Sequence, residues 1–330
     1  MEQVQARTPR ATEGAGRAGL LFVAWLAIAG MAGFVAARAL GLTDRHSELF
    51  ALATLTPWLL LPCGAALVLA AVLRARALAV ASVLLLAVTA AWVAPDLRWW
   101  STAAAVEGPT TVVAAANVGP EHRRAAEMAA DLVTIEADVL NVVELTPVDQ
   151  AALRAAGIHE RYPHSFEAPR SGGFGSGIYS RYPVRDGRVL RVAGTPMASA
   201  VVELPSGPTT VIAVHTSQPL TDAGRLAAEL EELGRIVRDS DGPVVLAGDF
   251  NATRQHQPFR SLLEVGLTDA HLATGRGWSA TWPTDRRIPP FALIDHVLVS
   301  RELTAASAGE ITIRGTDHRA VVATIGRAAR

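Results

Sequence analysis

Three long apolar runs occupy the N-terminal third of the chain. They extend over Ala18–Ala37, Leu49–Leu73 and Ala77–Pro95, are 20, 25 and 19 residues long, and contain no charged side chain. A helix of about 20 apolar residues is long enough to cross the hydrocarbon core of a bilayer. A buried core helix would be shorter or would show a polar face. The runs therefore predict three membrane-spanning helices.

From Thr110 onward, short β-rich runs alternate with segments of helical periodicity. Helices are expected over Glu121–Glu136 and Asp222–Arg238. Nine strands with few helices predict a mixed sheet or a pair of sheets, not a simple parallel strand–helix–strand series. The nine strand-like runs are Thr110–Asn117, Asp138–Leu145, Ser176–Pro183, Met197–Leu204, Thr209–Thr216, Pro243–Phe250, Ile294–Ser300, Glu310–Arg314 and Ala320–Ile325.

These patterns divide the chain into four parts. We expect a tail at 1–17, a membrane region at 18–98, a linker at 99–109 and one α/β domain at 110–330. About 220 residues are ample for a single hydrophobic core.

Arginine placement predicts the orientation of the membrane region, because short cytoplasmic segments are enriched in basic residues. An odd number of spans with a cytoplasmic tail puts the α/β domain outside the cell, on a bacterial plasma membrane. The margin is five arginines against three: Arg7, Arg10, Arg17, Arg74 and Arg76 on the tail side, and Arg38, Arg45 and Arg98 on the other. An aromatic belt at the outer face is expected from Trp92, Trp99 and Trp100.

Composition narrows the function classes. All 30 basic residues are arginine, so no lysine is present for Schiff-base or phosphate-loop chemistry. The single cysteine, Cys63, excludes an intramolecular disulfide and a cysteine-based zinc site. Residues 101–330 contain 22 arginines and 26 acidic residues, a net charge of −4 with neutral histidines. A protein that binds the backbone of duplex DNA usually has an excess of basic residues, so nucleic acid is the less favoured partner.

Polar side chains of catalytic type stand at the ends of the expected strands. Asn117, Glu144 and His215 come at or near the ends of three strands, and Asp249 and Asn251 follow the apolar run 243–247. Side chains in such places leave a sheet at a common rim, where α/β proteins build their sites. Taken singly, Asn117 can be a turn residue, Glu144 a solvated strand end and His215 a hydrogen-bonded core histidine.

Three short motifs are harder to explain as turns alone. Gly-Asp-Phe-Asn-Ala stands at 248–252, Ile-Asp-His at 294–296 and Thr-Asp-His at 316–318. An Asx-turn accounts for one of these motifs, but not for its recurrence. An aspartate that orients a histidine for proton transfer is a common catalytic arrangement. His296 follows its aspartate within a strand and is expected to point to the opposite face.

From Thr110 to Ile325 the chain resembles the endonuclease/exonuclease/phosphatase superfamily. The resemblance rests on Asn117, Asp-Val-Leu-Asn-Val-Val-Glu at 138–144, Ser-Gly-Ile-Tyr-Ser-Arg-Tyr-Pro-Val at 176–184, His215, and the motifs at 248–252, 294–298 and 316–321. It implies a four-layer sandwich of two mixed β-sheets flanked by helices. Three spans before such a domain also resemble the membrane-bound vancomycin and teicoplanin resistance phosphohydrolases of actinobacteria.

The resemblance also implies roles for individual residues. Glu144 would be the main ligand of a Mg²⁺ or Mn²⁺ ion, with Asn117 and Asp317 at the same metal site. His318 would activate or stabilise the attacking water, held in its tautomer by Asp295. Asp249 would position the water, Asn251 would bind the phosphoryl group, and His215 would donate to a phosphate oxygen or the leaving group. The general base is either a histidine or an aspartate.

Two departures from the family pattern bear on specificity. Val143 stands where the family usually has glutamine, and the histidine strand reads Ala-Val-His-Thr at 213–216. No residue matches the tyrosine that abasic-site nucleases place between these motifs, which argues against that specificity.

The expected function is a membrane-anchored, Mg²⁺- or Mn²⁺-dependent hydrolase of phosphoester or pyrophosphate bonds. A domain tethered at the bilayer meets lipid headgroups at high effective concentration. A lipid-linked substrate such as undecaprenyl pyrophosphate is therefore favoured, with the bilayer itself as the other partner. An anchored extracellular nuclease or phosphodiesterase is the second hypothesis. A non-catalytic binding module ranks third, because such a module would be expected to have lost some of the site residues.

Overall fold

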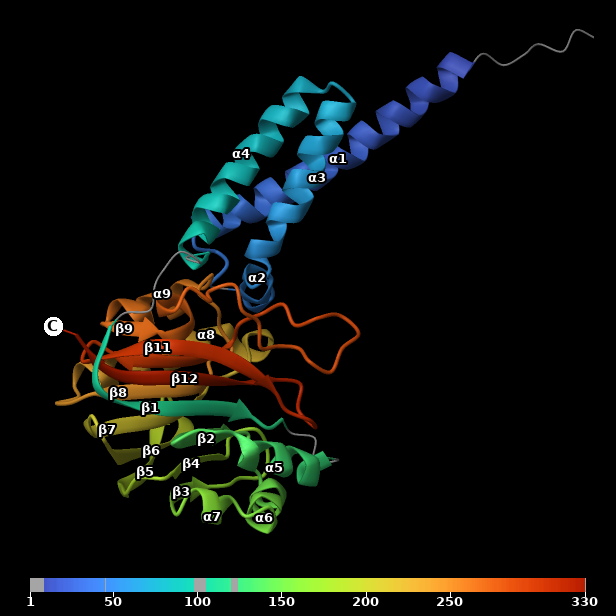
Figure 1. Cartoon of the computed structure of the whole chain (residues 1–330). Helices are drawn as coiled ribbons and strands as arrows, with labels where there is room; N and C mark the ends of the chain where they lie inside the picture. The colour runs from blue at the N-terminus through green and yellow to red at the C-terminus, as the bar shows by residue number, and fades with distance from the viewer. Residues whose placement is uncertain (1–8, 45, 98–104, 120–123, 330) are drawn as a thin grey trace, which may run out of the picture. The chain divides into compact units, whose positions relative to one another are not determined.

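The structure is a computed structural model that describes residues 9–44, 46–97, 105–119 and 124–329 (Figure 1). Its contacts divide the chain into two compact units. One unit contains Met1–Thr43 and Leu55–Ala94, and the other contains Asp44–Thr54 and Pro95–Arg330. The short segment between the first two apolar helices thus belongs to the same unit as the C-terminal sheets.

The first unit is a set of apolar helices. It contains α1 (Pro9–Ala39), the 3₁₀ helix η1 (Thr56–Leu59), α3 (Leu60–Val72) and α4 (Arg76–Val93), which the short η2 (Ala94–Asp96) extends. Two continuous helical stretches, Ala15–Ala39 and Arg76–Asp96, are long and apolar enough to cross a membrane. A third candidate exists if α2 (Ser47–Ala53) and Thr56–Val72, bent by 64°, count as one span. By length and composition, these two to three candidate spans indicate a membrane protein.

The apolar run Leu49–Leu73 is thus not one straight helix. Its first residues belong to α2, where Phe50 is fully buried in the core of the second unit. These residues are apolar because they pack in a protein core, a reason that hydropathy alone cannot separate from membrane insertion. Part of the orientation argument rests on Arg7, Arg45, Arg98, Trp99 and Trp100, which lie outside the described residues.

The second unit contains two six-stranded mixed sheets. In the first sheet the order β11–β12–β1–β2–β4–β3 corresponds to Leu303–Thr312, Arg319–Ala328, Val106–Asn117, Val139–Val143, Ser176–Ser180 and His164–Ala168. In the second the order β5–β6–β7–β8–β10–β9 corresponds to Val184–Val192, Thr195–Leu204, Gly207–His215, Val244–Asp249, Asp295–Ser300 and Leu267–Asp269. Only β1 with β2 and β7 with β8 pair in parallel; the other described pairs are antiparallel.

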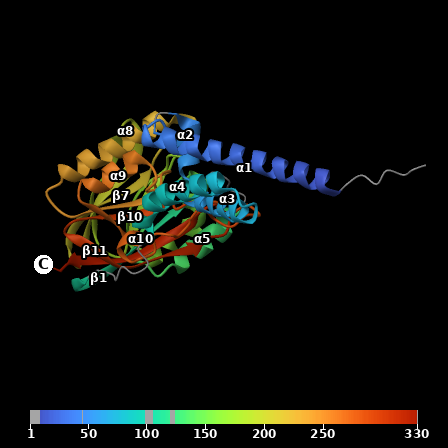
Figure 2. The ribbon, with the colours of Figure 1, turned by 90° about the horizontal axis from the view of Figure 1, so that it is seen from above.

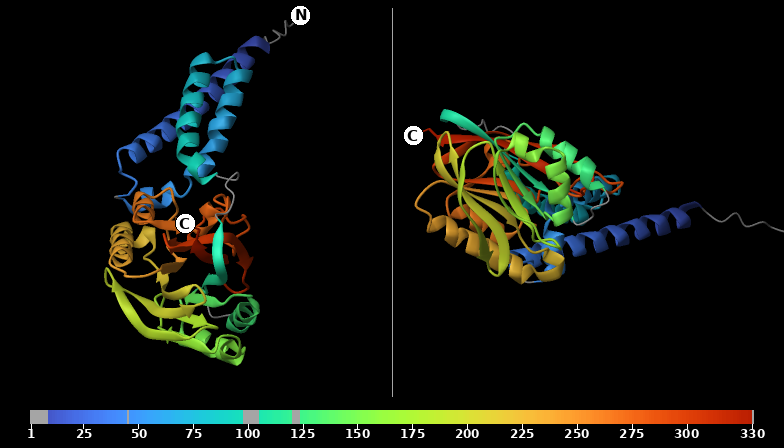
Figure 3. Two further views of the ribbon diagram at one scale, coloured as in Figure 1. Left: turned by 60° about the vertical axis from the view of Figure 1, so that its left-hand side comes forward. Right: turned by 90° about the horizontal axis from the view of Figure 1, so that it is seen from below.

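Helices cover the outer face of each sheet. The helices α5 (Ala125–Thr134), α6 (Pro147–Ala155) and α7 (Ile158–Arg161) share a core with the first sheet, and α8 (Pro219–Arg238), α9 (Gln257–Glu264) and α2 share one with the second. A third cluster of valines and alanines fills the space between the sheets. Figures 2 and 3 show the resulting layers, with the green helices on one outer face and the golden helices on the other. The short α10 (Ala270–Ala273) follows β9.

Two features of the central strands hold the structure together beneath the rim, one between the sheets and one within the second sheet. Asn141 of β2 reaches across the sandwich, and its Nδ2 donates to the backbone oxygens of Ile212 and Ala247 at 3.1 and 3.0 Å. Gly248 has a φ of 152°, and a Cβ there would lie 2.0 Å from the carbonyl oxygen of Val214. Any larger residue at 248 would therefore push β7 and β8 apart.

The expected fold class is confirmed: apolar N-terminal helices precede a sandwich of two mixed sheets with flanking helices. Each of the nine expected strand runs overlaps an observed strand, although β11 begins at Leu303 instead of Glu310. Three further strands, β3, β5 and β9, complete the sheets. The first residues of the helix expected over 121–136 lie outside the described part of the chain.

Candidate functional site

Strand ends from both sheets meet at one rim of the sandwich. Asn117 and His215 are the last residues of β1 and β7, and Glu144 directly follows β2. In the second sheet, Asp249 at the end of β8 pairs with both His215 and Asp295 in the strand register. Parallel neighbours end at the same edge, and antiparallel neighbours begin there, so their polar side chains converge.

Two of the converging residues adopt left-handed backbone conformations. Glu144 has a φ of 58° and Asn251 a φ of 47°. Such a conformation costs a residue other than glycine about 1–2 kcal/mol, although asparagine tolerates it better. It turns each side chain out of its strand direction and into the rim. Strained residues of this kind concentrate at functional sites.

The Asn117 side chain joins carboxylates of the two sheets. Its Nδ2 donates to Glu144 Oε1 at 3.1 Å and to Asp249 Oδ2 at 3.0 Å, and its Oδ1 accepts from the Gly119 amide at 2.9 Å. In this arrangement Asn117 orients two carboxylates, and its oxygen is engaged by the backbone. To serve as a metal ligand, the amide group would have to rotate.

His215 lies beside the same carboxylates. Its Nε2 is 3.3 Å from Glu144 Oε1 and 3.8 Å from Asp249 Oδ2, both within ion-pair range. Neither ring nitrogen, however, forms a hydrogen bond with any described residue, although both are buried. The ring also packs 5.4 Å from that of Phe174. A buried imidazole without hydrogen bonds is available to a polar ligand.

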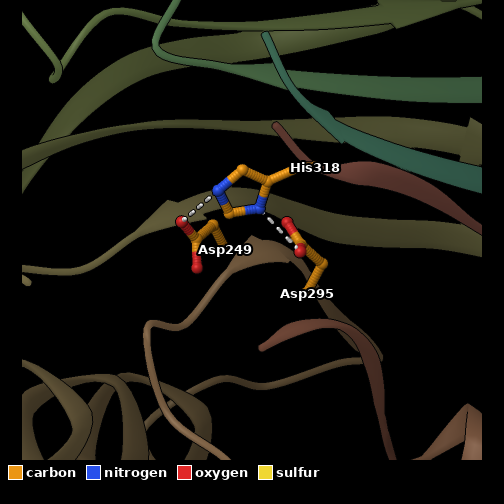
Figure 4. Close-up of side chains that lie close together, drawn as sticks. All are labelled: Asp249, Asp295 and His318. Carbon is orange, nitrogen blue, oxygen red and sulfur yellow. Dashed lines mark hydrogen bonds and ion pairs between the residues drawn. The ribbon is translucent and has the colours of Figure 1, made fainter. Parts of the chain in front are cut away.

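His318 lies between two aspartates (Figure 4). Its Nδ1 donates to Asp295 Oδ2 at 2.9 Å, and its Nε2 faces Asp249 Oδ2 at 3.9 Å. Burial disfavours the charged ring, but the charge and hydrogen bond of Asp295, with the charge of Asp249, outweigh burial and raise the pKa of His318 to about 10. Burial and the charge of Asp295 together raise the pKa of Asp249 to about 6, against the opposing effect of His318.

Asn251 is held by Asp249 at the end of β8 and by Thr216, which follows β7. Its backbone amide donates to Asp249 Oδ1 at 2.8 Å, and its Nδ2 donates to the Thr216 carbonyl at 3.0 Å and to Asp249 Oδ2 at 3.2 Å. A phosphoryl group would therefore have to replace one of these bonds in order to bind the Asn251 amide.

Asp317 is positioned by a loop that sequence reasoning missed. Trp282 Nε1 donates to Asp317 Oδ2 at 2.9 Å, and Asp317 Oδ1 lies 3.8 Å from His318 Nε2. In the same loop, Thr281 Oγ1 accepts from the Asp295 amide at 3.2 Å. The available signal was Thr-Trp-Pro at 281–283, an aromatic residue between a threonine and a proline.

His296 points away from the rim, toward the outer side of the second sheet. Its Nδ1 lies 3.0 Å from Asp269 Oδ2 and its Nε2 lies 3.1 Å from the Ala252 carbonyl. Its neighbour Asp295 faces the rim, as the alternation of side chains along a strand requires.

The donor set fits a divalent cation. One ligand atom from each of Asp249, Asp295 and His318 lies within 4.8 Å of the others, and all three residues are buried. Asp295 Oδ1 is buried and has no hydrogen-bond partner among the described residues, so it has a lone pair free for a cation. The nearby carboxylates of Glu144 and Asp317 add oxygen donors, the type that Mg²⁺ and Mn²⁺ prefer.

Comparison with known proteins places this arrangement in a family. The model of the endonuclease/exonuclease/phosphatase family matches residues 113–318, which include every rim residue described above. A search of curated proteins finds no match.

Several solved structures share the fold. An endonuclease/exonuclease/phosphatase protein of Beutenbergia cavernae is 19% identical with a TM-score of 0.51, over 67% of this chain and 72% of that one. Danio rerio TDP2, complexed with a single-strand DNA product, is 17% identical with a TM-score of 0.55, over 66% and 100%. SmcL is 16% identical with a TM-score of 0.50, over 65% and 98%. At these identities the likeness concerns the fold, but the family match covers more than half of the sequence, and the chain belongs to the endonuclease/exonuclease/phosphatase family.

Proposed function

We propose that this protein is a membrane-anchored, divalent-metal-dependent phosphohydrolase that cleaves a phosphoester or pyrophosphate bond of a lipid-linked substrate. The observation that carries the proposal is the position of His318 between Asp295 and Asp249. The same rim holds Glu144 and Asn117, so acid–base groups and oxygen donors for a cation face a common space. Metal-dependent phosphoryl transfer needs both.

Glu144 and Asp317 would hold the cation, together with Asn117 if its amide rotates. A bound Mg²⁺ or Mn²⁺ ion supplies charge neutralisation at the phosphoryl oxygens. The buried group of Asp249, Asp295 and His318 can itself bind a metal. We favour Glu144 as the main ligand because Nδ1 of His318 is already bonded to Asp295. Only Nε2 of His318 is then left to contact the substrate or a metal.

The remaining residues handle protons and charge. A ring between two carboxylates is stabilised as imidazolium, so His318 would stabilise negative charge on the phosphoryl group, held in place by Asp295. Asp249 would then accept the proton of the attacking water, since its raised pKa brings its basicity nearer to neutrality. Asn251 would donate to a phosphoryl oxygen, and His215 to a phosphate oxygen or the leaving group.

The covalent link to the apolar helices favours a substrate at the membrane surface. Two to three candidate spans precede the domain, and a domain tethered at a bilayer meets lipid headgroups at high effective concentration. A phosphate carried on a lipid, such as the undecaprenyl pyrophosphate that the sequence resemblance suggests, is a substrate of this kind. We place the site on the extracytoplasmic side.

A nuclease or phosphodiesterase is the second candidate. Danio rerio TDP2, which shares the fold, has been solved with a single-strand DNA product. The net charge of −4 over residues 101–330 opposes it, because binding a nucleic-acid backbone depends on excess positive charge. A non-catalytic module ranks last, since the rim keeps all of its acid–base groups.

The candidates are separated by assaying the detergent-purified full chain in Mg²⁺ against three substrates. These are a prenyl pyrophosphate, a sphingomyelin-like phosphodiester and single-stranded DNA. We expect the prenyl pyrophosphate to be turned over fastest. Preferred cleavage of DNA would support the nuclease instead, and inactivity of a folded protein on all three would support a binding module.

A further inference from the structure

The segment that follows Asn251 is buried although it is a loop. Residues 252–256 all lie inside the second unit, and Arg254 is only 8% exposed. A buried arginine needs charged partners, because its desolvation is otherwise costly. Two of the partners of this segment come from residues that directly adjoin the apolar helices in sequence.

Asp96 is the first of these partners. Its Oδ1 accepts from Arg254 Nε at 2.9 Å, and its Oδ2 accepts from Gln255 Nε2. The Arg254 guanidinium also donates to the Gly277 carbonyl at 2.8 Å, and a Cβ on Gly277 would lie 2.0 Å from the Asp96 carbonyl oxygen. Close packing and a paired charge thus hold Asp96 against the loop.

Arg254 extends this contact toward the strands of the site. Its Nη1 donates to Asp269 Oδ2 at 3.0 Å, and the same oxygen lies 3.0 Å from His296 Nδ1. Burial opposes ionisation of Asp269, but the charges of Arg254 and His296 outweigh it and hold the pKa of this carboxyl well below its ordinary value. His296 then contacts the Ala252 carbonyl, next to Asn251, and itself adjoins Asp295 in β10.

The α2 segment is the second partner. The rings of Phe50 and His256 stack with centroids 3.9 Å apart and planes 8° from parallel. His256 Nε2 donates to the Phe50 carbonyl at 2.8 Å, and the Gln257 amide donates to Asp44 Oδ1 at 3.2 Å. All of these residues belong to the second unit.

We infer that Asp96 and α2 are positioning elements for the loop that carries Asp249 and Asn251. The sequence that joins the apolar helices to the domain is then part of the support of the site, and not only a tether. Because Asn251 holds a left-handed backbone conformation, a loop released from this support would relax away from the geometry described above. The kinetic part of this inference rests on the proposed phosphohydrolase function; the structural part does not.

Hydrogen exchange on the detergent-solubilised full chain tests the structural part. Asp96→Asn removes the charge that pairs with Arg254 but keeps the side-chain shape. We expect amide exchange in 249–257 to accelerate about tenfold or more, with exchange in the core strands unchanged. The matched control is Glu203→Gln, which removes the partner of Arg185 between β5 and β6. Equal exchange at 249–257 in Asp96→Asn and the control would overturn the inference.

Kinetics test whether the support matters for turnover. Asp96→Asn should lower kcat about tenfold with little change in KM, measured well below its thermal midpoint, since a small displacement of positioned groups affects the chemical step. The thermal midpoint should also fall, because Arg254 loses a charged partner. Asp96→Glu, which retains the charge, should recover part of the loss. Unchanged kcat, with exchange accelerated as expected, would contradict positioning of the site. If the wild type has no phosphohydrolase activity, the proposed function fails, while the exchange result still decides the structural claim.

If Asp96→Asn does not fold, Asp44→Ala replaces it. This variant removes only the acceptor of the Gln257 amide and leaves the Phe50 stack intact. Asp44 belongs to the same short segment of the second unit as α2. We expect a smaller acceleration of exchange, confined to the end of the loop nearest 257, and exchange there equal to the wild type would contradict support of the loop by this segment.

Discussion

His318 and Asp295 join the two sheets at the rim of the sandwich. His318 directly precedes β12 of the first sheet and Asp295 begins β10 of the second, yet His318 Nδ1 lies 2.9 Å from Asp295 Oδ2. The bond fixes the orientation of the ring and leaves Nε2, which also carries a hydrogen in the charged ring, facing Asp249. Neither residue could do this from within a single sheet, so the sandwich itself assembles the pair.

This pair should behave as a unit in kinetics. Asp295→Asn is expected to preserve folding and metal binding and to lower kcat by about 10²-fold or more, because the amide cannot stabilise the charged ring. His318→Ala should be at least as damaging. The double variant should be scarcely worse than His318→Ala, since residues that act together are strongly non-additive.

Turnover and thermal midpoint, measured on the same three variants, check this prediction. If the contact of Asp295 with His318 serves only the stability of the fold, activity will fall in step with the folded fraction. Multiplicative losses in kcat with unchanged folding would show that the two residues do not act as a pair.

The pKa of His318 predicts a loss of stability at alkaline pH. A folded-state pKa of about 10, against the ordinary 6.5, means that the folded protein holds this proton more tightly than the unfolded chain. The stabilisation is complete below pH 6.5 and is lost as the pH rises toward 10. In chelator, the thermal midpoint of the wild type should fall between pH 7 and 9.5 by about 5 °C more than that of His318→Gln.

The titration of Asp249 does not interfere with this measurement. Its pKa is raised from 3.8 to about 6, so its own contribution changes only on the acid side of neutrality, where protonation favours the folded state. Parallel pH profiles of the wild type and His318→Gln above pH 7 would contradict the assignment of a charged His318.

Much of the fold could be predicted from sequence because most strands of the sandwich have a buried face. The strand β5 was missed because six of its nine residues are exposed, four of them charged, as expected at a sheet edge. The three-residue β9 is too short to show a period. The bend in the run Leu49–Leu73 could not be predicted, because Phe50 packs in the protein core and hydropathy does not distinguish such a residue from one in a bilayer.

The candidate site could be predicted where its residues lie close together in the sequence. Asp249 and Asn251 are two residues apart at a strand end, and His318 and Asp317 are adjacent. The contacts of Trp282 with Asp317 and of Asp96 with Arg254 join residues 35 and 158 positions apart. No local periodicity encodes such pairs, and only the assembled sheets bring them together.

Trp282 gives a test of the loop beside the site. Trp282→Phe keeps an aromatic ring but removes the indole donor to Asp317 Oδ2. A lost hydrogen bond to a carboxylate should lower kcat/KM about tenfold, with a smaller effect on the thermal midpoint. Phe291→Leu, which changes the ring packed against Trp282, is the control for packing alone. Equal effects of the two substitutions on kcat/KM would show that the hydrogen bond does not matter.

The proposed orientation is tested by fusions after Arg330. If the domain is extracytoplasmic, a fusion to alkaline phosphatase should be active and a fusion to green fluorescent protein should not fluoresce, because each reporter matures on one side of the membrane only. The reverse pair of results would place the domain in the cytoplasm and would remove an outer-leaflet substrate from consideration.

The central claim is that the rim is a metal-dependent phosphohydrolase site with Glu144 as a ligand. The most direct measurement is phosphate release from a prenyl pyrophosphate by the wild type, Glu144→Gln and the control Glu136→Gln, whose side chain is exposed. Each protein is assayed in excess chelator and after addition of Mg²⁺. We predict activity in Mg²⁺ for the wild type and Glu136→Gln, none in chelator, and a loss of at least about 10²-fold in Glu144→Gln, because an amide lacks the ligand's charge. Full wild-type activity in excess chelator, or an unimpaired Glu144→Gln, would contradict the account.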